Sequence, residues 1–347
     1  MRDIKGLKIT LIGGAGFIGH NLALHLKSLG AVVTVIDSLQ VNNLYAFENA
    51  AADLVNRELY LKIIKERLDL LRHADIPLHL QDARDYHALS ALLSDIQPQV
   101  VVHLAAVSHA NRANKDPYST FDHSLRTLEN ALDGVRGQKD MHFIFFSSSM
   151  VYGDFLEEAM TEDMPCNPIG IYGALKFAGE KIVIAYGQVF GLNYTIIRPS
   201  ALYGERCVSR RVGQIFLENA LEGKDLTING AGLEKLDFTY IQDLTLGVVN
   251  AIQYPKARNE IFNITCGEGR SIVDMAQLVQ KTFPNVRIIH EAREAFMPIR
   301  GTLSVEKAKT LMHYHPHFSL EEGYARYIAW YQQFCHIQNN PQLVMVE

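Results

Sequence analysis

Two residues that could exchange a proton lie four positions apart in the segment YGALK, residues 172–176. If this segment is helical, the phenol of Tyr172 and the ammonium of Lys176 share one face. The positive charge then favours the phenolate and brings Tyr172 into the range of general acid–base catalysis. A surface pair has the same spacing, so a second observation is needed. The serine triplet 147–149 supplies it, because Ser148 could donate to a substrate oxygen while Tyr172 moves its proton.

A glycine-rich turn joins the apolar run at 9–12 to an apolar-periodic segment that begins at Phe17. The order strand, glycine turn, helix is the context that a dinucleotide fingerprint requires. Gly13 can adopt the strained torsions of the turn, Gly16 lets backbone N–H groups approach a pyrophosphate, and Gly19 lets the helix pack closely. The helix N-terminus then presents its partial positive charge to the phosphates. A glycine-rich turn that binds no ligand can have the same sequence, so the neighbouring residues must show whether this one binds a nucleotide.

Acidic residues at the ends of the next two strands favour NAD as the ligand. The apolar run 31–36 ends at Asp37, about where a carboxylate would accept hydrogen bonds from the adenosine ribose and repel a 2′-phosphate. Residues 77–80 predict a third strand, which is followed by Asp82. This side chain could accept from an adenine amino group, or it could cap the helix that follows.

Strand-like runs alternate with helical patterns over the first two-thirds of the chain, which predicts a doubly wound, parallel α/β sheet of the Rossmann type. The run 100–106 is almost wholly apolar, as in a strand buried on both faces, and so is 143–146. Ala105 and Ala106 leave room for the nicotinamide half of a cofactor. Ligands of such sheets lie outside the carboxyl ends of the strands, so one crevice could hold all of these residues.

The pattern loosens beyond residue 198 and suggests a smaller α/β lobe that closes over the crevice. We expect a nucleotide-binding domain over 1–198, a substrate lobe over 199–337 that returns to the core near 236–252, and a frayed tail at 338–347. The elements expected in the lobe are a strand at 261–265 and helices at 271–282 and 319–334.

An insertion near residues 40–75 contains an amphipathic pattern at 57–72. The apolar stripe predicts a surface helix. It could cover the adenosine end of the site, meet a partner subunit, or simply pack against the neighbouring helix.

Composition excludes several classes of protein. With 347 residues, 48% of them hydrophobic, the chain can bury a large core. The net charge of −5 and the dispersed Lys and Arg residues speak against nucleic acid as a partner. No signal peptide or membrane-spanning run is visible, so we expect a cytoplasmic protein without a membrane partner. Its four scattered cysteines favour free thiols over disulfides or a metal site.

Six motifs occur in the order seen in the extended short-chain dehydrogenases/reductases. Over about residues 7–332 the chain resembles the NAD-dependent sugar-nucleotide epimerase/dehydratase family of that group. The motifs are GGAGFIG at 13–19, HLAA at 103–106, SSSMVYG at 147–153, YxxxK at 172–176, RPSALYG at 198–204 and DFTYIQD at 237–243.

The resemblance implies a role for each residue of the catalytic set. Tyr172 is the catalytic base, Lys176 binds the nicotinamide ribose and lowers the pKa of the tyrosine, and Ser148 is the serine partner. The substrate would be a nucleoside-diphosphate sugar whose nucleotide lies in the C-terminal lobe. The implied NAD contacts are Gly13, Gly16, Phe17, Ile18, Gly19, Asp37, Asp82, Ala83, Leu104, Ala105, Ala106, Tyr172, Lys176 and Pro199.

Met150 reduces the number of reactions that this family resemblance allows. Dehydratases and decarboxylases of the family usually carry Glu at this position, and 3,5-epimerases carry Cys. A thioether cannot exchange a proton, so oxidation and reduction at the sugar's 4-position remain. We expect an NAD-dependent 4-epimerase that works through a transient 4-keto sugar. A dehydrogenase, reductase or 4,6-dehydratase is the nearest alternative, and a non-catalytic NAD-binding regulator is the alternative from another class.

The loop SHANR at 108–112 points to a different subfamily, because it is similar to the S-H-V-D-R loop of dTDP-glucose 4,6-dehydratases. Its histidine could contact the substrate, act as an auxiliary acid–base group, or be structural. Many relatives also carry Asn at the position of Ala201 and Arg at that of Leu236, and other arginines could replace that charge. The candidate substrate-binding residues are Ser108, His109, Arg112, Ser149, Met150, Arg206, Arg211, Lys235 and Arg300.

The segment 172–190 is apolar nearly all round, although a helix that lies on a sheet needs only one apolar face. In the family this helix builds a two-fold interface. We therefore expect a homodimer.

Overall fold

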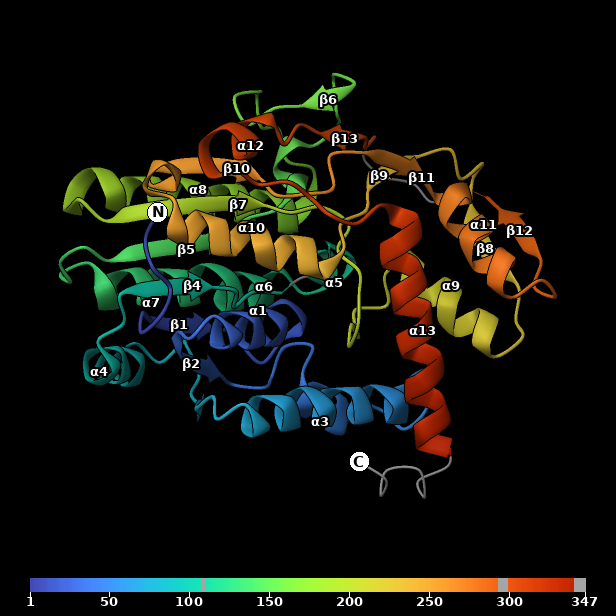
Figure 1. Cartoon of the computed structure of the whole chain (residues 1–347), viewed down its shortest axis with the longest axis horizontal. Coiled ribbons are helices and arrows are strands. Elements are labelled where there is room, and N and C mark those ends of the chain that lie inside the picture. Colours follow the sequence, from blue (N-terminus) through green and yellow to red (C-terminus); the bar gives the residue numbers. More distant parts are fainter. Residues whose placement is uncertain (108–109, 293–298, 340–347) are drawn as a thin grey trace.

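Seven parallel strands form the central sheet (Figure 1). The computed structural model describes residues 1–107, 110–292 and 299–339. Strand order is β10-β7-β5-β4-β1-β2-β3, so the direction of winding changes between β1 and β4, where ligands of such sheets bind. The strands are β1 (Lys8–Ile12), β2 (Val32–Asp37), β3 (Leu78–Leu80), β4 (Val100–His103), β5 (His142–Phe146), β7 (Asn193–Arg198) and β10 (Glu260–Asn263).

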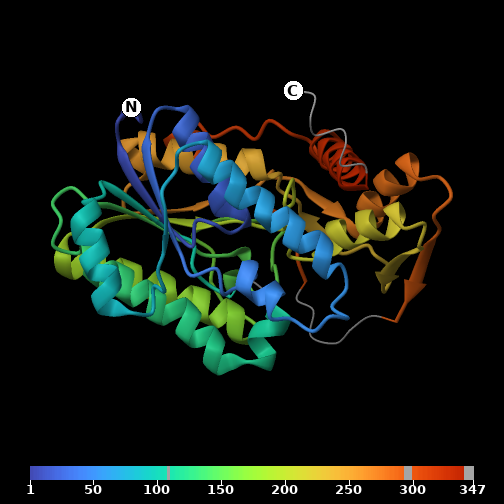
Figure 2. The same ribbon diagram turned by 90° about the horizontal axis from the view of Figure 1, so that it is seen from below.

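The apolar strands are buried on both faces, as their sequences predict. In β4, Val101 packs into one core cluster, while Val100 and Val102 pack into the other. Helices cover both faces (Figure 2). One layer contains α1 (Phe17–Ser28), α3 (Arg57–His73) and α10 (Ile241–Gln253), and the other contains α4 (Tyr86–Ile96), α7 (Thr127–Val135) and α8 (Gly170–Phe190).

A smaller lobe lies beyond the carboxyl ends of the strands, at the right of Figure 1. It contains a parallel pair, β8 with β12, and an antiparallel pair, β9 with β11. Helix α11 begins with a capping box between Ser271 and Asp274. The lobe elements are α9 (Val212–Leu221), β8 (Leu226–Asn229), β9 (Lys235–Asp237), β11 (Gly269–Ser271), α11 (Ile272–Thr282), β12 (Ile288–Glu291) and the long helix α13 (Leu320–Asn339) beside it.

One expected lobe strand belongs to the main sheet instead. Strand β10 pairs with β7 at the sheet edge, with Phe262 opposite Ile197. Phe262 is fully buried in the core cluster that also contains α10, so its burial explains this placement. The return of the chain to the nucleotide-binding domain therefore extends past residue 252.

No helix of the described residues is long and apolar enough to cross a membrane. Shorter elements connect the layers described above. They are α2 (Leu44–Glu48), α5 (Ala110–Lys115), α6 (Pro117–Phe121), the π-helical turn η1 (Asp122–Arg126), η2 (Ser149–Tyr152), β6 (Ala159–Met160), η3 (Pro255–Ala257), β13 (Thr302–Leu303) and α12 (Glu306–Met312).

The inserted helix α3 packs on α1 and α2 and also reaches the lobe. Its Tyr60 hydroxyl donates to Glu218 of α9 at 2.8 and 2.9 Å, and the Nε of the fully buried Arg67 donates to the Arg206 carbonyl at 2.9 Å. Packing on a neighbouring helix, one of the three roles considered for this segment, is thus observed, together with polar contacts to the lobe.

Candidate active site

The glycine turn follows β1 and has the geometry that its glycine spacing predicts. Gly13 has a φ of +81°, and a Cβ there would lie 2.6 Å from the Ala105 nitrogen. A Cβ on Gly19 would lie 2.4 Å from the Cα of Gly14, so only glycine allows the helix to pack this closely. At Gly16 the nearest atom would be 3.4 Å away, so the space in front of the α1 N-terminus is open.

A cleft of about 970 Å³, partly open to solvent, begins at this turn; we call it the first cleft. It runs along the carboxyl ends of the central strands and brings together most of the predicted cofactor contacts. Those that line it are Gly13, Gly16, Phe17, Ile18, Gly19, Asp37, Asp82, Ala83, Leu104, Ala105 and Ala106. Three predicted contacts do not line it: Tyr172, Lys176 and Pro199. The Pro199 carbonyl accepts from the Ser149 N–H at 3.0 Å.

Asp37 lies at the end of β2 and faces the glycine turn. Its Oδ2 accepts from the Ala15 N–H at 2.9 Å, and its Oδ1 accepts from the Leu39 N–H at 2.7 Å. Burial raises the pKa of this carboxyl above its ordinary value, while the two N–H donors act in the opposite direction. Each carboxylate oxygen can accept more than one hydrogen bond, so this group fits a ribose diol and disfavours a 2′-phosphate.

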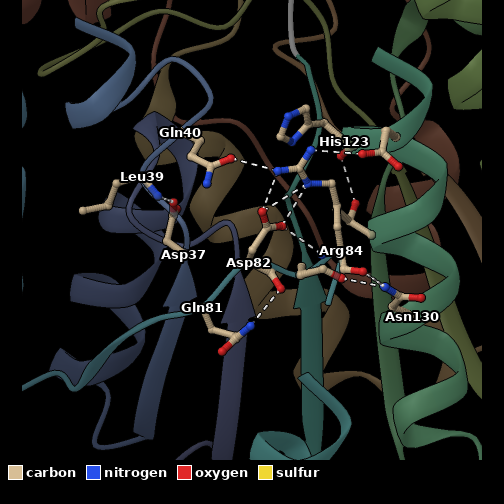
Figure 3. Close-up of polar contacts among 11 residues, drawn as sticks. Asp37, Leu39, Gln40, Gln81, Asp82, Arg84, His123 and Asn130 are labelled. Carbon is tan, nitrogen blue, oxygen red and sulfur yellow. Dashed lines mark hydrogen bonds and ion pairs between the residues drawn. The ribbon is translucent and has the colours of Figure 1, made fainter. Parts of the chain in front are cut away.

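Asp82 lies at the next strand end, where Arg84 binds it (Figure 3). The Arg84 guanidinium donates to Asp82 at 2.6 Å, to Asp122 at 3.0 Å and to Gln40 at 3.0 Å. This pairing lowers the pKa of Asp82 against the effect of its burial. The alternative that Asp82 caps α4 is wrong, because the Asp85 side chain accepts from the N-terminal turn of that helix.

Several residues that line the first cleft were not predicted. Two of them, His123 and Thr127, lie where the π-helical turn η1 interrupts the helix between α6 and α7. Such π-bulges are frequent at functional sites, but the sequence has no local signal for one. The others are Ile12, Ile36, Ser38, Val41, Asn42, Gln81, Leu202 and Ser209. Of these, only Leu202 lies within one of the six motifs, RPSALYG at 198–204.

The predicted acid–base residues surround the end of β5. Ser148 is buried, and its hydroxyl accepts from the Met150 N–H at 3.2 Å. Helix α8 approaches so closely that a Cβ on Gly173 would lie 2.7 Å from the Met150 carbonyl oxygen. The backbone of Tyr172, the neighbour of this glycine, therefore lies beside residues 147–150, which we call the serine turn. Lys176, one helical turn later, is buried and donates to the Phe146 carbonyl at 2.6 Å.

Burial lowers the pKa of Lys176 to about 8, and Glu180 partly counteracts this effect. Glu180 itself forms a buried ion pair with Arg198 of β7, with the two closest atoms 2.7 Å apart. Arg198 also donates to the Tyr152 hydroxyl at 2.9 Å. This network connects α8, β7 and η2, so it fixes the serine turn relative to the helix that carries Tyr172 and Lys176. Sequence reasoning missed Glu180, although it follows Lys176 by one helical turn.

A second cleft, of about 720 Å³ and partly open to solvent, lies between the sheet and the lobe. Arg211 lines both clefts and thus marks their junction. Arg300 lines the second cleft, and its guanidinium donates to Ser149 Oγ at 2.8 Å and to Met150 Sδ at 2.9 Å. The two positions at which relatives carry polar groups, Ala201 and Leu236, also line this cleft.

The other predicted substrate contacts are not brought to these clefts. Arg206 pairs with Glu66 of α3 at 3.1 Å and stacks over Trp330. Lys235 is exposed on β9 and lines neither cleft. Ser108, His109 and the side chain of Arg112 fall outside the described residues.

Comparison with known proteins identifies the family. The model of the NAD dependent epimerase/dehydratase family matches residues 9–265. An uncharacterized UDP-glucose epimerase of Bacillus subtilis, YtcB, is 30% identical over 93% of this chain and 98% of its own. The dTDP-glucose 4,6-dehydratase 1 of Escherichia coli is 26% identical over 94% of this chain and 92% of its own.

Solved structures agree with this result. The UDP-glucuronic acid 4-epimerase of Bacillus cereus, in complex with UDP-glucuronic acid and NAD, has a TM-score of 0.82 at 27% identity. The match covers 94% of this chain and 99% of the other. The chain belongs to the NAD-dependent epimerase/dehydratase family and is an NAD-dependent enzyme of the Rossmann fold.

Proposed function

We propose that the protein is a UDP-sugar 4-epimerase that works through a transient 4-keto sugar. One observation carries this choice within the family: the serine turn presents Met150, whose sulfur contacts Arg300, where related dehydratases carry a carboxylate. Of the described residues that line the two clefts, the only carboxylates are Asp37 and Asp82, both at the adenosine end of the first. A reaction that needs only one proton-exchanging centre at the sugar fits this arrangement.

Tyr172 and its neighbours supply the proton chemistry. The Tyr172 oxygen takes the proton of the sugar 4-hydroxyl, and Ser148 donates a hydrogen bond to the same sugar oxygen. The charge of Lys176, fixed by the Phe146 carbonyl, stabilises the phenolate. NAD, bound along the first cleft, supplies reversible hydride acceptance. After the keto sugar turns, Tyr172 returns its proton to the oxygen at carbon 4, now with the opposite configuration.

The relatives support uridine diphosphate as the nucleotide that carries the sugar. Those named above include two proteins that act on UDP-sugars and one that acts on a dTDP-sugar. We propose that Arg211, at the junction of the two clefts, binds the diphosphate and that the nucleoside lies in the second cleft. The expected NAD contacts are the predicted residues that line the first cleft.

An assay of purified protein with UDP-, GDP-, CDP- and dTDP-sugars tests the proposal, with products followed by NMR and NADH by absorbance. An isomeric sugar without net NADH is expected. Loss of water would instead indicate a dehydratase, and stoichiometric NADH a dehydrogenase. Tight NAD binding without turnover of any sugar would favour the regulator.

The variant Tyr172→Phe tests the proposed base. We expect turnover to fall by at least roughly a hundredfold, while the affinity for NAD stays within about threefold. The matched control is Tyr118→Phe, because Tyr118 is 86% exposed on α6 and lines neither cleft. Near-normal turnover in Tyr172→Phe would refute this mechanism.

A further inference from the structure

Within the described part of the chain, the positive charge of Arg300 has no acidic hydrogen-bond partner, and it lies beside the proposed catalytic serine. The three polar contacts described for it are neutral: the hydroxyls of Ser149 and Ser200, at 2.8 and 3.2 Å, and the sulfur of Met150, at 2.9 Å. Its Nε is buried and has no hydrogen-bond partner among the described residues. A thioether is a weak acceptor, so these contacts replace little of the hydration that a guanidinium loses on burial.

No carboxylate of the described residues forms an ion pair with Arg300. Asp237, a carboxylate that acts on it electrostatically, already accepts hydrogen bonds from Thr265 at 3.0 Å and from the Leu303 and Gly267 N–H groups at 3.1 and 3.3 Å. Burial and the charge of Arg211 lower the pKa of Arg300 to about 10, so it stays a cation at neutral pH. Charges that are largely removed from water are normally paired in proteins, so this half-buried guanidinium can take an anion from the ligand.

The position of Arg300 indicates which part of the ligand carries that anion. Arg300 binds Ser149, the residue after the serine that we place at the sugar 4-oxygen, and Tyr172 is close enough to affect its pKa. Arg211 lines both clefts and lies where a diphosphate would pass between them, whereas Arg300 lines the second cleft alone and contacts Ser149. Because of this contact, we place Arg300 against the sugar and Arg211 against the diphosphate.

We propose that Arg300 binds a carboxylate on the sugar ring, so that the substrate is a nucleoside-diphosphate uronic acid. This inference rests on the proposed function, which places the reacting sugar at Ser148 and Tyr172. A carboxylate on the sugar would accept from Nη1, whose present partner is the weak thioether acceptor of Met150, and it would add the charge attraction that a neutral hydroxymethyl group lacks. Met150 contributes because its sulfur is easily replaced as an acceptor, whereas a glutamate at this position would pair with the guanidinium.

Calorimetric titration of the NAD-loaded protein with UDP, UDP-glucose and UDP-glucuronate tests the proposal. We expect UDP-glucuronate to bind at least roughly tenfold more tightly than UDP-glucose. Arg300→Met should remove that preference but leave the affinity for UDP within about threefold. Met150→Glu should do the same by pairing with Arg300, whereas Met150→Gln, of similar shape but neutral, should keep the preference. Arg287→Met is the control, since Arg287 is exposed and lines neither cleft.

Three outcomes would overturn the inference: equal affinity of the wild type for both sugars, a loss of UDP affinity in Arg300→Met as large as the loss for UDP-glucuronate, or a preference that survives Met150→Glu. The second would show that Arg300 binds phosphate. Equal affinities with turnover of UDP-glucose would leave the epimerase proposal standing. Tight, Arg300-dependent binding of UDP-glucuronate without formation of its 4-epimer would contradict the epimerase and leave the inference intact.

Discussion

At the scale of single residues, burial shifts the pKa values of charged groups in the site toward neutral pH. Lys176 is the clearest case, because its ammonium is buried and its nearest hydrogen-bond partner is the neutral Phe146 carbonyl. Among the residues that the structure describes, its one favourable electrostatic partner, Glu180, is shared with Arg198. The protein therefore holds this cation with less compensation than an ordinary ion pair provides, and the charge should be sensitive to pH.

We predict that turnover falls on the alkaline side with a midpoint near pH 8. The pKa of Lys176 is lowered to about 8, so its charge is present below that pH and is lost as the pH rises through it. Without the charge, the phenolate of Tyr172 is less stabilised. Turnover measured from pH 6 to 10 at saturating substrate checks this prediction.

Replacement by arginine gives a sharper test, because a guanidinium keeps its charge over this whole range. Lys176→Arg should flatten the alkaline fall, whatever its effect on the maximal rate. Lys181→Arg, at an exposed position of the same helix, should keep the wild-type profile. An unchanged midpoint in Lys176→Arg would assign the titration to another group.

At the scale of elements, the inserted helix α3 supports the wall of the second cleft. Tyr60 of α3 donates to the buried carboxylate of Glu218, which also accepts from Gln214 at 2.7 Å and Tyr331 at 2.7 Å. Gln214 lines the second cleft, and its side-chain oxygen accepts from the Arg210 N–H at 2.9 Å. A chain of hydrogen bonds thus leads from the insertion to the residue before Arg211.

Tyr60→Phe should reduce the free energy of unfolding by about 1–3 kcal/mol, because a buried carboxylate loses a donor. If α3 also positions the cleft wall, the KM for the sugar nucleotide should rise more than kcat falls. Urea denaturation and steady-state kinetics measure the two effects. Tyr45→Phe on α2 is the control, since Tyr45 is 40% exposed. A variant as stable as this control would show that the contact contributes nothing.

Local sequence patterns predict the elements better than the contacts between them. The strand runs and the glycine turn follow from composition and spacing, since each apolar run needs burial on both faces. The position of β10 depends instead on Phe262 reaching a core that is built by distant segments. Likewise, Arg84 and Glu180 look like ordinary surface charges until folding brings them to Asp122 and Arg198. Pairings of this kind are long-range and carry no local pattern.

At the scale of the whole molecule, α8 connects the active site to the proposed dimer. Its buried side carries Lys176 and Glu180, while its other side has small and apolar residues at helical spacing. Ala174, Ala185 and Val189 are exposed on that side, and Val189 is 71% exposed. One charged residue, Lys181, is also exposed there, with its ammonium over the Phe177 ring. A second copy that packs on this stripe would bury apolar surface and stiffen the helix that carries Tyr172.

We predict that the wild type has twice the 39.0 kDa mass of the chain in sedimentation equilibrium, and that Ala185→Arg shifts it to the monomer. In a two-fold interface the same residue is present on both subunits, so one substitution places two positive charges close together. Because Ala185 is exposed and arginine favours helices, the monomer should keep its far-ultraviolet circular dichroism. Ala51→Arg, at an exposed site after α2, should remain dimeric. A monomeric wild type would contradict the homodimer, and a dimeric Ala185→Arg variant would place the interface elsewhere. In either case the exposed stripe of α8 would need another explanation.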